Sequence, residues 1–539
     1  MRPAPTVRAH LEKGRRRSAG RRLASFTAAA AALALALTAC AGSASPAPGS
    51  GGGEAVHGES MSVGVQQAPA NLDPGTLDKA FTDFTMLAYD PLFYMSPEGE
   101  VQPRLAESWE YVGDGNTELH VKIREGVTFS DGDALDAAAV KGSLEYARDS
   151  NGSHSFFLKD MTFEATDEFD LTITSTTPNP LIPNVLTQVY PIGQIISPTG
   201  LKDPSALTLE GESHGAGQYV YDAASSVIGD HFTYKANPDY WNTDIQYWDE
   251  ITYKVVANHQ AALNAAKTDQ IKVFKGDLTI AQQATSAGLQ VVANPAILTG
   301  LYLTDRNGEV TPALGDVKVR QAINFAIDRE SVTEALLGEY GEPTFQMSIE
   351  GADGYSEASA DYYSYDPEKA KELLAEAGYP DGFDLTITTA VFAGFEPLGE
   401  AIKSQLAEVG ITVTTDVKSD IGSYVDAVTG GESSAFVGGF SAAPMYQQGI
   451  DFWLPGSNFY NPFGIEPEEL TALWNEAAAA GDDARAPLDA EMQDYLVKNA
   501  WNAPVMFAPA IYFAREEIGG VATSAGAPFA SPFDWHLTE

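Results

Sequence analysis

Alternating and periodic apolar positions predict a chain of short strands and helices from about residue 61 onward. Apolar and polar residues alternate over Leu119–Ile123 and Phe169–Thr174, which is typical of half-buried strands. The other elements expected in the first half are strands at 61–65, 217–221, 251–256, 271–274 and 289–292 and helices at 78–89, 135–148, 259–268 and 279–286. This alternation of strand and helix predicts an α/β fold.

The segment from residue 296 to about 503 continues the alternation with clearer helix boundaries. Asp366 followed by Pro367 is a strong helix start, because Asp accepts hydrogen bonds from free amides and Pro suits the first helical position. Apolar residues then repeat at helical spacing over 370–377, and Gly378 ends the helix. A helix over 316–337 is expected to break at 327–328 and to restart with Asp328 as its cap.

The remaining elements include a strand that is expected to return to an earlier sheet. They are strands at 383–389, 411–417 and 504–513 and helices at 397–409, 466–480 and 487–499. Two α/β bodies with several chain crossings between them predict a cleft, and ligands usually bind in such clefts.

The first 40 residues have the pattern of an export signal. An arginine-rich head precedes an uncharged apolar run over Phe26–Leu37, which is too short for a permanent membrane span. The run leads into Leu37-Thr-Ala-Cys40, which resembles the lipobox of bacterial lipoproteins. We therefore expect residues 1–39 to be a signal peptide, Cys40 to be lipidated, and residues 40–60 to form a flexible tether. A plain secretory signal with an unrelated cysteine is the alternative, and both Sec and Tat export stay open.

Charge and length narrow the class of protein. The chain has 32 Lys and Arg against 74 Asp and Glu, a formal net charge of −42, and the part beyond the basic leader carries −49. Such an acidic surface repels phosphate backbones and anionic lipid, which argues against nucleic-acid binding and charge-driven membrane adhesion. Because the chain has one cysteine, no internal disulfide forms and core burial must stabilise the fold. The length predicts two or three domains.

Five motifs in a fixed order carry a family resemblance. They are Leu72–Gly75 (Leu-Asp-Pro-Gly), Pro103–Trp109, Arg124–Gly132, Asp316–Arg329 and Tyr365–Leu374. With them, the chain resembles the family-5 extracellular solute-binding proteins, the dipeptide, oligopeptide and nickel-binding group that serves ABC importers, over nearly all of residues 61–539. Most of the motif residues are interpreted as scaffold; Arg320 and Asp328, for example, are expected to form an ion pair or helix caps.

The resemblance implies a type II periplasmic-binding-protein fold of the α/β class, with two lobes joined by hinge strands and an extra domain inserted in lobe I. It places lobe I at 61–95, 210–297 and 506–539, the inserted domain at 96–209, and lobe II at 298–505. It also implies a monomeric receptor without a cofactor, held by its lipid anchor at the outer face of the cytoplasmic membrane. Such a receptor closes over a small solute or peptide and presents it to the membrane subunits of an ABC permease.

The candidate ligand wall is Phe436–Phe463, a segment with eight aromatic residues in 28. Rigid rings on loops offer a large contact area at little entropic loss, although ordinary packing of an irregular loop is the alternative for each of them. The candidate ligand-binding residues are Phe440, Ser441, Ala443, Tyr446, Trp453, Phe459 and Tyr460, together with Leu72 and His214.

The same segment departs from the peptide-binding members of the family. These carry a Gly-Trp motif followed shortly by an Asp that pairs with the α-ammonium of the ligand. The matching stretch here, Gly439–Pro444, has Phe440 in place of Trp and no carboxylate. A buried ammonium without its partner costs several kcal/mol, so that contact cannot be made in the usual way, and Asp451 is a weaker candidate for it. Peptide remains the largest single ligand class; oligosaccharide, metal chelate or another small polar solute together weigh as much.

Two patterns are weak candidates for other chemistry. Gly211–Gly215 fits the Gly-x-Ser-x-Gly pattern with Ser213 as a hydrolase nucleophile, but a strand rather than a helix is expected after it. The histidines beyond the leader are scattered, whereas metal capture needs them paired, and His214 is the best placed to close on a chelate. We expect no catalytic residue and no resident metal. A surface serine hydrolase and a non-transporting sensor or adhesion protein remain the alternative functions.

Overall fold

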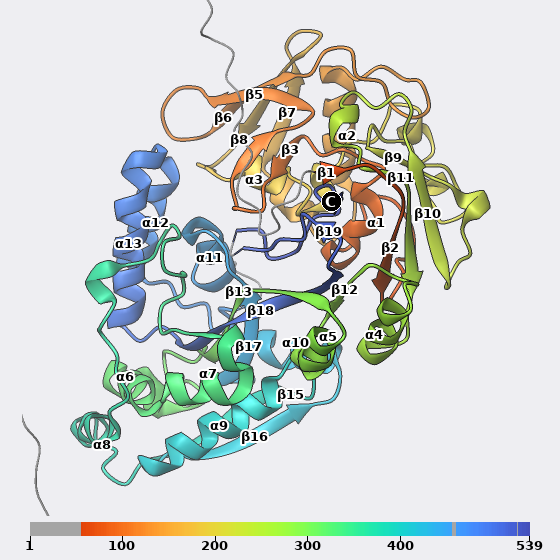
Figure 1. Cartoon of the computed structure of the whole chain (residues 1–539). Coiled ribbons are helices and arrows are strands. Elements are labelled where there is room, and N and C mark those ends of the chain that lie inside the picture. Colours follow the sequence, from red (N-terminus) through yellow and green to blue (C-terminus); the bar gives the residue numbers. More distant parts are fainter. Residues whose placement is uncertain (1–54, 455–459, 525) are drawn as a thin grey trace, which may run out of the picture. The chain divides into compact units, whose positions relative to one another are not determined.

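The computed structural model describes residues 55–454, 460–524 and 526–539 (Figure 1). Its largest sheet has eleven strands: ten follow the order β16-β15-β17-β13-β18-β12-β2-β11-β10-β9, and β14 pairs with β18. Their bounds are β2 Gly58–Val65, β9 Tyr219–Tyr221, β10 His231–Ala236, β11 Trp248–Val255, β12 Val273–Gly276, β13 Leu289–Leu303, β14 Glu342–Pro343, β15 Asp384–Ala390, β16 Thr412–Lys418, β17 Ala435–Ser441 and β18 Ala503–Arg515.

The helices and the smaller sheets complete the fold. The helices are α1 Thr82–Met86, α2 Ala137–Asp149, α3 Ile182–Val185, α4 His259–Lys267, α5 Ala281–Ser286, α6 Val317–Ala326, α7 Arg329–Leu337, α8 Pro367–Glu376, α9 Phe395–Glu408, α10 Ile421–Thr429, α11 Met445–Phe452, α12 Glu468–Ala479 and α13 Asp482–Lys498. The other strands are β1 Ala55–Val56, β3 Phe93–Met95, β4 Val101–Pro103, β5 Ala106–Tyr111, β6 Glu118–Ile123, β7 Met161–Ala165, β8 Asp170–Ser175, β19 Ile518–Gly519 and β20 His536–Thr538.

Separate hydrophobic cores lie along these sheets. The β15 core, named here for its central strand, gathers Leu181 and buried residues of 298–507 beneath α6, α8 and α9. The β11 core packs β2, β9, β10 and β11 against residues of the C-terminal segment. The β6 core fills the four-stranded sheet β5-β6-β8-β7 and the face of α2, and it draws on residues 92–216. A smaller α4–α5 cluster covers β12 and the end of β18.

Two long antiparallel strands, β13 and β18, run from one core to the next and lie side by side (Figure 1). The end of β13, from Leu298, lies in the β15 core, while its first residue, Leu289, lies in the α4–α5 cluster. Between them Asn294 is exposed, and the pairing with β18 shifts register after Pro295. The crossing between the cores is therefore the least buried part of both strands.

Several expected helix boundaries are confirmed. Asp366 accepts a hydrogen bond from the Lys369 amide at 2.8 Å, and α8 starts at Pro367. The predicted break at 327–328 separates α6 from α7, and Asp328 caps α7 through the amide of Ser331. Arg320 makes no pair with Asp328; instead its guanidinium donates to backbone carbonyls at the end of α13, including that of Asn499 at 3.0 Å.

Other boundaries differ from the sequence expectation. The helix expected at 78–89 is a 3-10 turn over Lys79–Phe81 followed by the five residues of α1. The strand expected at 289–292 continues to Leu303, because pairing with two neighbouring strands overrides the interrupting Asn and Pro. Strands β1 and β2 begin at Ala55 and Gly58, inside the range expected to be a tether. The predicted signal peptide and Cys40 lie outside the described residues.

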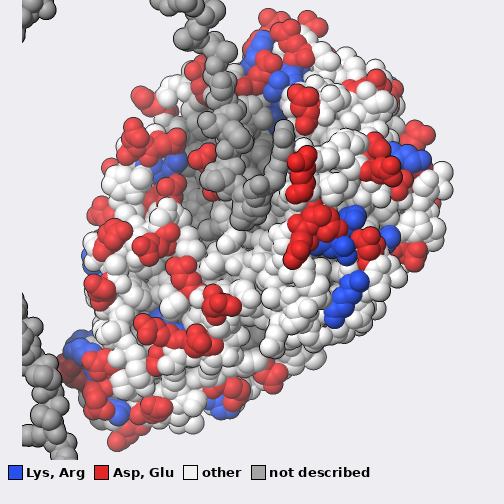
Figure 2. Space-filling view, in the orientation of Figure 1, with Lys and Arg blue, Asp and Glu red and all other residues white. Residues whose placement is uncertain are grey.

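Acidic side chains are spread over the face of the molecule seen in Figure 2, with few Lys and Arg between them. Over the ranges 55–454, 460–524 and 526–539, no helix is both long and apolar enough to cross a membrane.

Candidate functional site

The aromatic residues of 436–463 pack mainly on one another in the β15 core. Tyr302 of β13 stacks on Phe436 and Phe452, with ring centroids 5.2 and 5.6 Å apart. Phe440 stands edge-on to Tyr302 at 4.9 Å and contacts Tyr460 at 4.1 Å. Phe440 and Tyr460 remain partly exposed, so they are the rings of this cluster that reach beyond the core.

Other predicted site residues hold the scaffold. Trp453 has no exposed surface, and Leu72 is 3% exposed in the β11 core. Tyr446 stacks on Trp474 with centroids 4.7 Å apart, and its hydroxyl donates to the carbonyl of Pro178 at 3.0 Å. Ala443 is partly exposed, and Phe459 lies outside the described residues.

His214 is engaged in a local network. Its Nδ1 lies 2.8 Å from Oδ2 of Asp131, and the Ser197 hydroxyl donates to the same oxygen at 2.5 Å. Burial acts to raise the pKa of Asp131, but hydrogen bonds from Ser197 and His214 outweigh it and lower that pKa. His214 therefore links its own segment to the turn that contains Asp131. Within the described part of the chain, no group of three or more His, Cys, Asp or Glu is arranged to hold a metal ion.

Ser441, at the end of β17, is the predicted residue that lines a cavity. This cavity has a volume of about 360 Å³. Its other walls come from the turn and helix at 78–86, from Lys275 of β12 and Tyr512 of β18, and from the C-terminal segment with Phe529 and Asp534. The cavity therefore meets the end of a β15-core strand on one side and elements around the β11 core on the others.

Two carboxylates in the cavity wall already have partners. Asp534 accepts a hydrogen bond from the Tyr94 hydroxyl at 2.6 Å. Asp78 caps the turn through the amide of Ala80 at 2.9 Å and accepts from the Ser153 hydroxyl at 3.1 Å. These contacts fix the wall and leave the remaining charged groups of the lining to face the cavity.

Those remaining groups are Lys79, Lys275 and Asp83, and their titration is perturbed. Burial raises the pKa of Asp83 to about 6, although the charge of Lys275 opposes this. Burial lowers the pKa of Lys79 to about 8, against the charges of Asp451 and Asp78. The Lys275 side chain is exposed to the cavity, yet the surrounding protein is dense enough to lower its pKa. Charged groups whose pKa values are shifted by burial in a cavity are typical of binding sites.

Asp451, the weaker sequence candidate, lies near this cavity rather than in it. Its Oδ1 accepts from the Gln447 side-chain amide at 3.1 Å, and its charge acts on Lys79. Burial raises the pKa of the Asp451 carboxyl to about 6.

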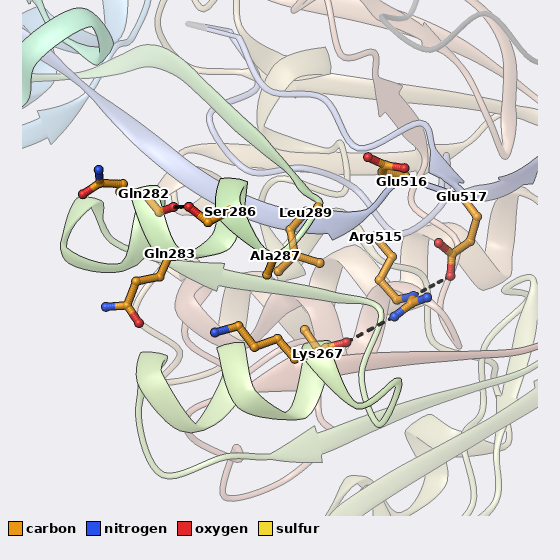
Figure 3. Close-up of a pocket in the computed structure, with 11 residues that line it drawn as sticks. Lys267, Gln282, Gln283, Ser286, Ala287, Leu289, Arg515, Glu516 and Glu517 are labelled. Atoms are coloured by element: carbon orange, nitrogen blue, oxygen red, sulfur yellow. Dashed lines mark hydrogen bonds and ion pairs between the residues drawn. The ribbon is translucent and has the colours of Figure 1, made fainter.

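A second hollow of about 770 Å³ lies between α4, α5 and the end of β18 (Figure 3). Exposed polar side chains such as Lys267, Gln282 and Ser286 line it. Its guanidinium, that of Arg515, is already paired with Glu517 at 2.6 Å. This groove is the larger of the two, but its lining comes only from α4, α5, the start of β13, the end of β18 and the residues that adjoin them. We therefore place the candidate site in the cavity at Ser441, where strand β17 also contributes.

Ser213 lacks the setting of a hydrolase nucleophile. It is 4% exposed, and its hydroxyl oxygen accepts a hydrogen bond from the Tyr221 amide at 3.2 Å. The segment after it enters β9, a strand, where a nucleophile elbow needs a helix.

A family model covers most of this architecture. Residues 100–461 match the model described as bacterial extracellular solute-binding proteins, family 5 middle. The chain belongs to this family. Its members are extracytoplasmic substrate-binding proteins that work with the permease subunits of ABC importers. The family resemblance and the α/β binding-protein fold expected from the sequence are thus confirmed.

Known relatives differ in what they bind. The glutathione-binding protein GsiB of Shigella boydii is 30% identical over 333 residues, which are 60% of this chain and 62% of GsiB, so the match leaves more than a third of GsiB uncovered. Two solved structures share the fold. DppA of Helicobacter pylori in complex with the peptide STSA has a TM-score of 0.72 at 21% identity and covers 90% of this chain and 99% of its own. AgaA of A. tumefacien in complex with agropinic acid has a TM-score of 0.71 at 23% identity and covers 89% and 99%.

Proposed function

We propose that this protein is the lipid-anchored, extracytoplasmic receptor of an ABC importer and that it performs no covalent chemistry. It captures a small solute in the cavity lined by Ser441, closes around it and presents it to the permease. The cavity carries this proposal, because it places Ser441, at the end of strand β17, among elements around the β11 core, and the partly exposed stretch of β13 and β18 gives these bodies a place to bend.

The proposed division of the chain follows the core clusters. Lobe I comprises 61–95, 210–297 and 506–539, the inserted domain 96–209, and lobe II 298–505. The separate β11, β6 and β15 cores support a division into three bodies. Some buried residues cross the bounds, because the β6 core includes Leu92 and Phe93 and the β11 core includes Ile196, Leu207 and Leu209.

Peptide is the proposed ligand class, with another small polar solute such as an oligosaccharide or a metal chelate as the alternative. The peptide complex of DppA and the name of GsiB support the first, and the agropinic acid complex of AgaA supports the second. A volume of about 360 Å³ suits a ligand of two or three amino-acid residues better than a long chain.

A thermal-shift panel tests the proposal. Short peptides, glutathione, oligosaccharides and nickel chelates are each added to the exported protein, and a true ligand at 100 times its Kd stabilises the fold by about 2.7 kcal/mol. Ser441→Trp fills the cavity and should abolish the shift, whereas Ser286→Trp in the groove of Figure 3 should leave it intact. The proposal fails if no compound shifts the melting temperature, or if Ser286→Trp alone removes the effect.

The anchor needs a separate test. In cells, Cys40→Ser should release the protein from the membrane fraction into the extracytoplasmic fluid, because one thioether-linked lipid site holds it. Retention of the Cys40→Ser variant in the membrane fraction would refute lipidation at this residue.

A further inference from the structure

The cavity presents an unusual set of charges for so acidic a protein. Of its carboxylates, Asp78 and Asp534 are occupied by hydrogen bonds within the wall. Over the described ranges, the structure records neither a hydrogen bond nor an ion pair for the side chains of Lys79, Lys275 and Asp83. The lining thus leaves two ammonium groups and one carboxylate open toward the cavity.

The two ammonium groups are arranged around one ring. Nζ of Lys275 lies 4.2 Å from the centroid of Phe529, and Nζ of Lys79 lies 5.9 Å from the same centroid. Lys79 also lies over Tyr190 at 4.5 Å. Aromatic faces hold a cation in place without neutralising it, so both lysines keep their capacity for an anion.

Almost all other lysines of the described residues have a hydrogen-bond or ion-pair partner. Among the 16 lysines of the described residues, only Lys267 shares with Lys79 and Lys275 the lack of a recorded hydrogen bond or ion pair, and Lys267 stands on the open groove of Figure 3. In a chain with 74 acidic residues, two unpaired lysines in one cavity are therefore a specific arrangement.

Asp83 supplies the opposite charge. It lines the same cavity as Lys275, and each of the two acts on the titration of the other. No hydrogen bond to its carboxylate is recorded over the described ranges, so this group is open to a donor from a ligand. The hydroxyl of Ser441, at the end of β17, adds an uncharged donor to the lining.

We propose that this cavity selects a small solute with two carboxylates and one ammonium, such as a short peptide that contains one acidic side chain. Lys79 and Lys275 bind the two carboxylates, and Asp83 binds the ammonium. This assignment rests on the proposed receptor function. It also replaces the missing carboxylate of Gly439–Pro444 with one from helix α1.

Three matched dipeptides test the proposal by calorimetric titration of the purified full-length mature protein. Alanyl-glutamate has both carboxylates and the ammonium, alanyl-glutamine lacks the second carboxylate, and N-acetyl-alanyl-glutamate lacks the ammonium. We expect alanyl-glutamate to bind about tenfold or more tightly than either of the others, since each loses one charge-assisted contact.

Substitutions assign the contacts. Lys79→Gln and Lys275→Gln should each weaken alanyl-glutamate binding by about ten- to hundredfold, and Asp83→Asn should do so for alanyl-glutamate but not for the acetylated peptide. Lys267→Gln is the matched control and should change nothing. Lys275→Arg keeps the charge and should keep most of the affinity, which separates loss of charge from loss of folding.

The outcomes distinguish two failures. If alanyl-glutamine binds as tightly as alanyl-glutamate, if the three substitutions act no differently from Lys267→Gln, or if only an uncharged solute of the wider panel binds, the charge assignment is wrong while the receptor function stands. If no solute of either panel binds, the receptor function itself fails.

Discussion

Pro295 of β13 lies directly opposite Pro509 of β18, at the point where the pairing of these strands shifts register. Neither residue has a backbone N–H, so the ladder lacks two donors at one position. On one side of this pair, β13 is bonded to both β17 and β18; on the other side it is bonded to β18 alone. The proline pair therefore marks the place where the sheet is easiest to bend.

Amide hydrogen exchange should reveal this difference. We expect the amides of Leu298–Leu303 to exchange about tenfold or more slowly than those of 289–297, because the former are buried and paired on both edges. A bound solute should slow exchange mainly in 289–297. Equal protection along the whole of β13, measured by mass spectrometry, would contradict a bend at the prolines.

A second prediction concerns a contact between the β6 and β15 regions. The side-chain amide of Asn116 donates to the carbonyls of Ala478 and Ala480, both at 2.8 Å, at the end of α12. Asn116 has a φ of +50°, so Gly is the substitution that removes the amide without strain. Asn116→Gly should speed solute dissociation about tenfold, since two hydrogen bonds that hold the bodies together are lost.

Stopped-flow release measures that rate. Asn242→Gly is the control, because this residue makes no recorded side-chain cap bond. An unchanged dissociation rate for Asn116→Gly would show that the contact persists when the solute leaves.

Burial separates the role of Trp453 from that of Ser441. Trp453 is completely buried, so Trp453→Ala should lower the free energy of unfolding by about 3–5 kcal/mol. Ser441→Ala should change it by no more than about 0.5 kcal/mol, while weakening solute binding. Denaturant titration checks both values. A stability loss for Ser441→Ala as large as that for Trp453→Ala would place Ser441 in the scaffold.

The local order of strands and helices could be predicted from the sequence, because the caps at Asp328 and Asp366 and the alternation at Leu119–Ile123 depend on neighbouring residues alone. The full length of β13 could not, since its middle gains hydrogen bonds only from β18, more than 200 residues away. Strand β1 could not be predicted for the same reason, because it pairs with β20 near the other end of the chain.

The candidate site was less accessible to sequence reasoning. The density of aromatic residues indicated which segment of the sequence to consider, but it did not show which of its residues are exposed. It could not separate the buried Trp453 from the lining residue Ser441. Lys79, Asp83 and Lys275 come from segments nearly 200 residues apart, and only the fold brings them to one cavity. The available sequence signal was weak: lysines are scarce in this chain, and the sequence does not show which of them lack a hydrogen-bond or ion-pair partner.

The buried hydroxyl of Ser213 provides a test against hydrolysis. Because it accepts a hydrogen bond from the Tyr221 amide, Ser213→Ala should cost about 1 kcal/mol of stability and leave solute affinity unchanged. Ser205→Ala, at an exposed position, should cost less than about 0.5 kcal/mol. If the protein has an esterase activity and the Ser213→Ala variant loses it, the result would instead support a serine hydrolase.

The last prediction is a pH dependence of stability from Asp489 of α13. Its side chain is 4% exposed, and its nearest cation, Arg485, is 4.0 Å away. Burial raises the pKa of the Asp489 carboxyl to about 7, with Arg485 opposing and Asp353 adding to the shift. Between the unfolded pKa, about 3.9, and pH 7 the folded state holds a proton that the unfolded state has lost. Stability therefore falls as the pH rises through this window.

Asp489→Asn removes this pH dependence of stability, because the amide carries no charge at any of these pH values. At pH 4 the variant and the unmodified protein should have nearly the same free energy of unfolding. As the pH rises the variant should become the more stable of the two, by up to roughly 4 kcal/mol above pH 7, where the difference levels off. Urea unfolding at pH 4, 5.5 and 7.5 measures it. Asp482→Asn is the matched control, since Asp482 also contacts Arg485 but is 90% exposed, and it should show no such gain. If the advantage of Asp489→Asn shrinks with rising pH, the carboxyl is ionised in the folded protein throughout and burial does not dominate its titration.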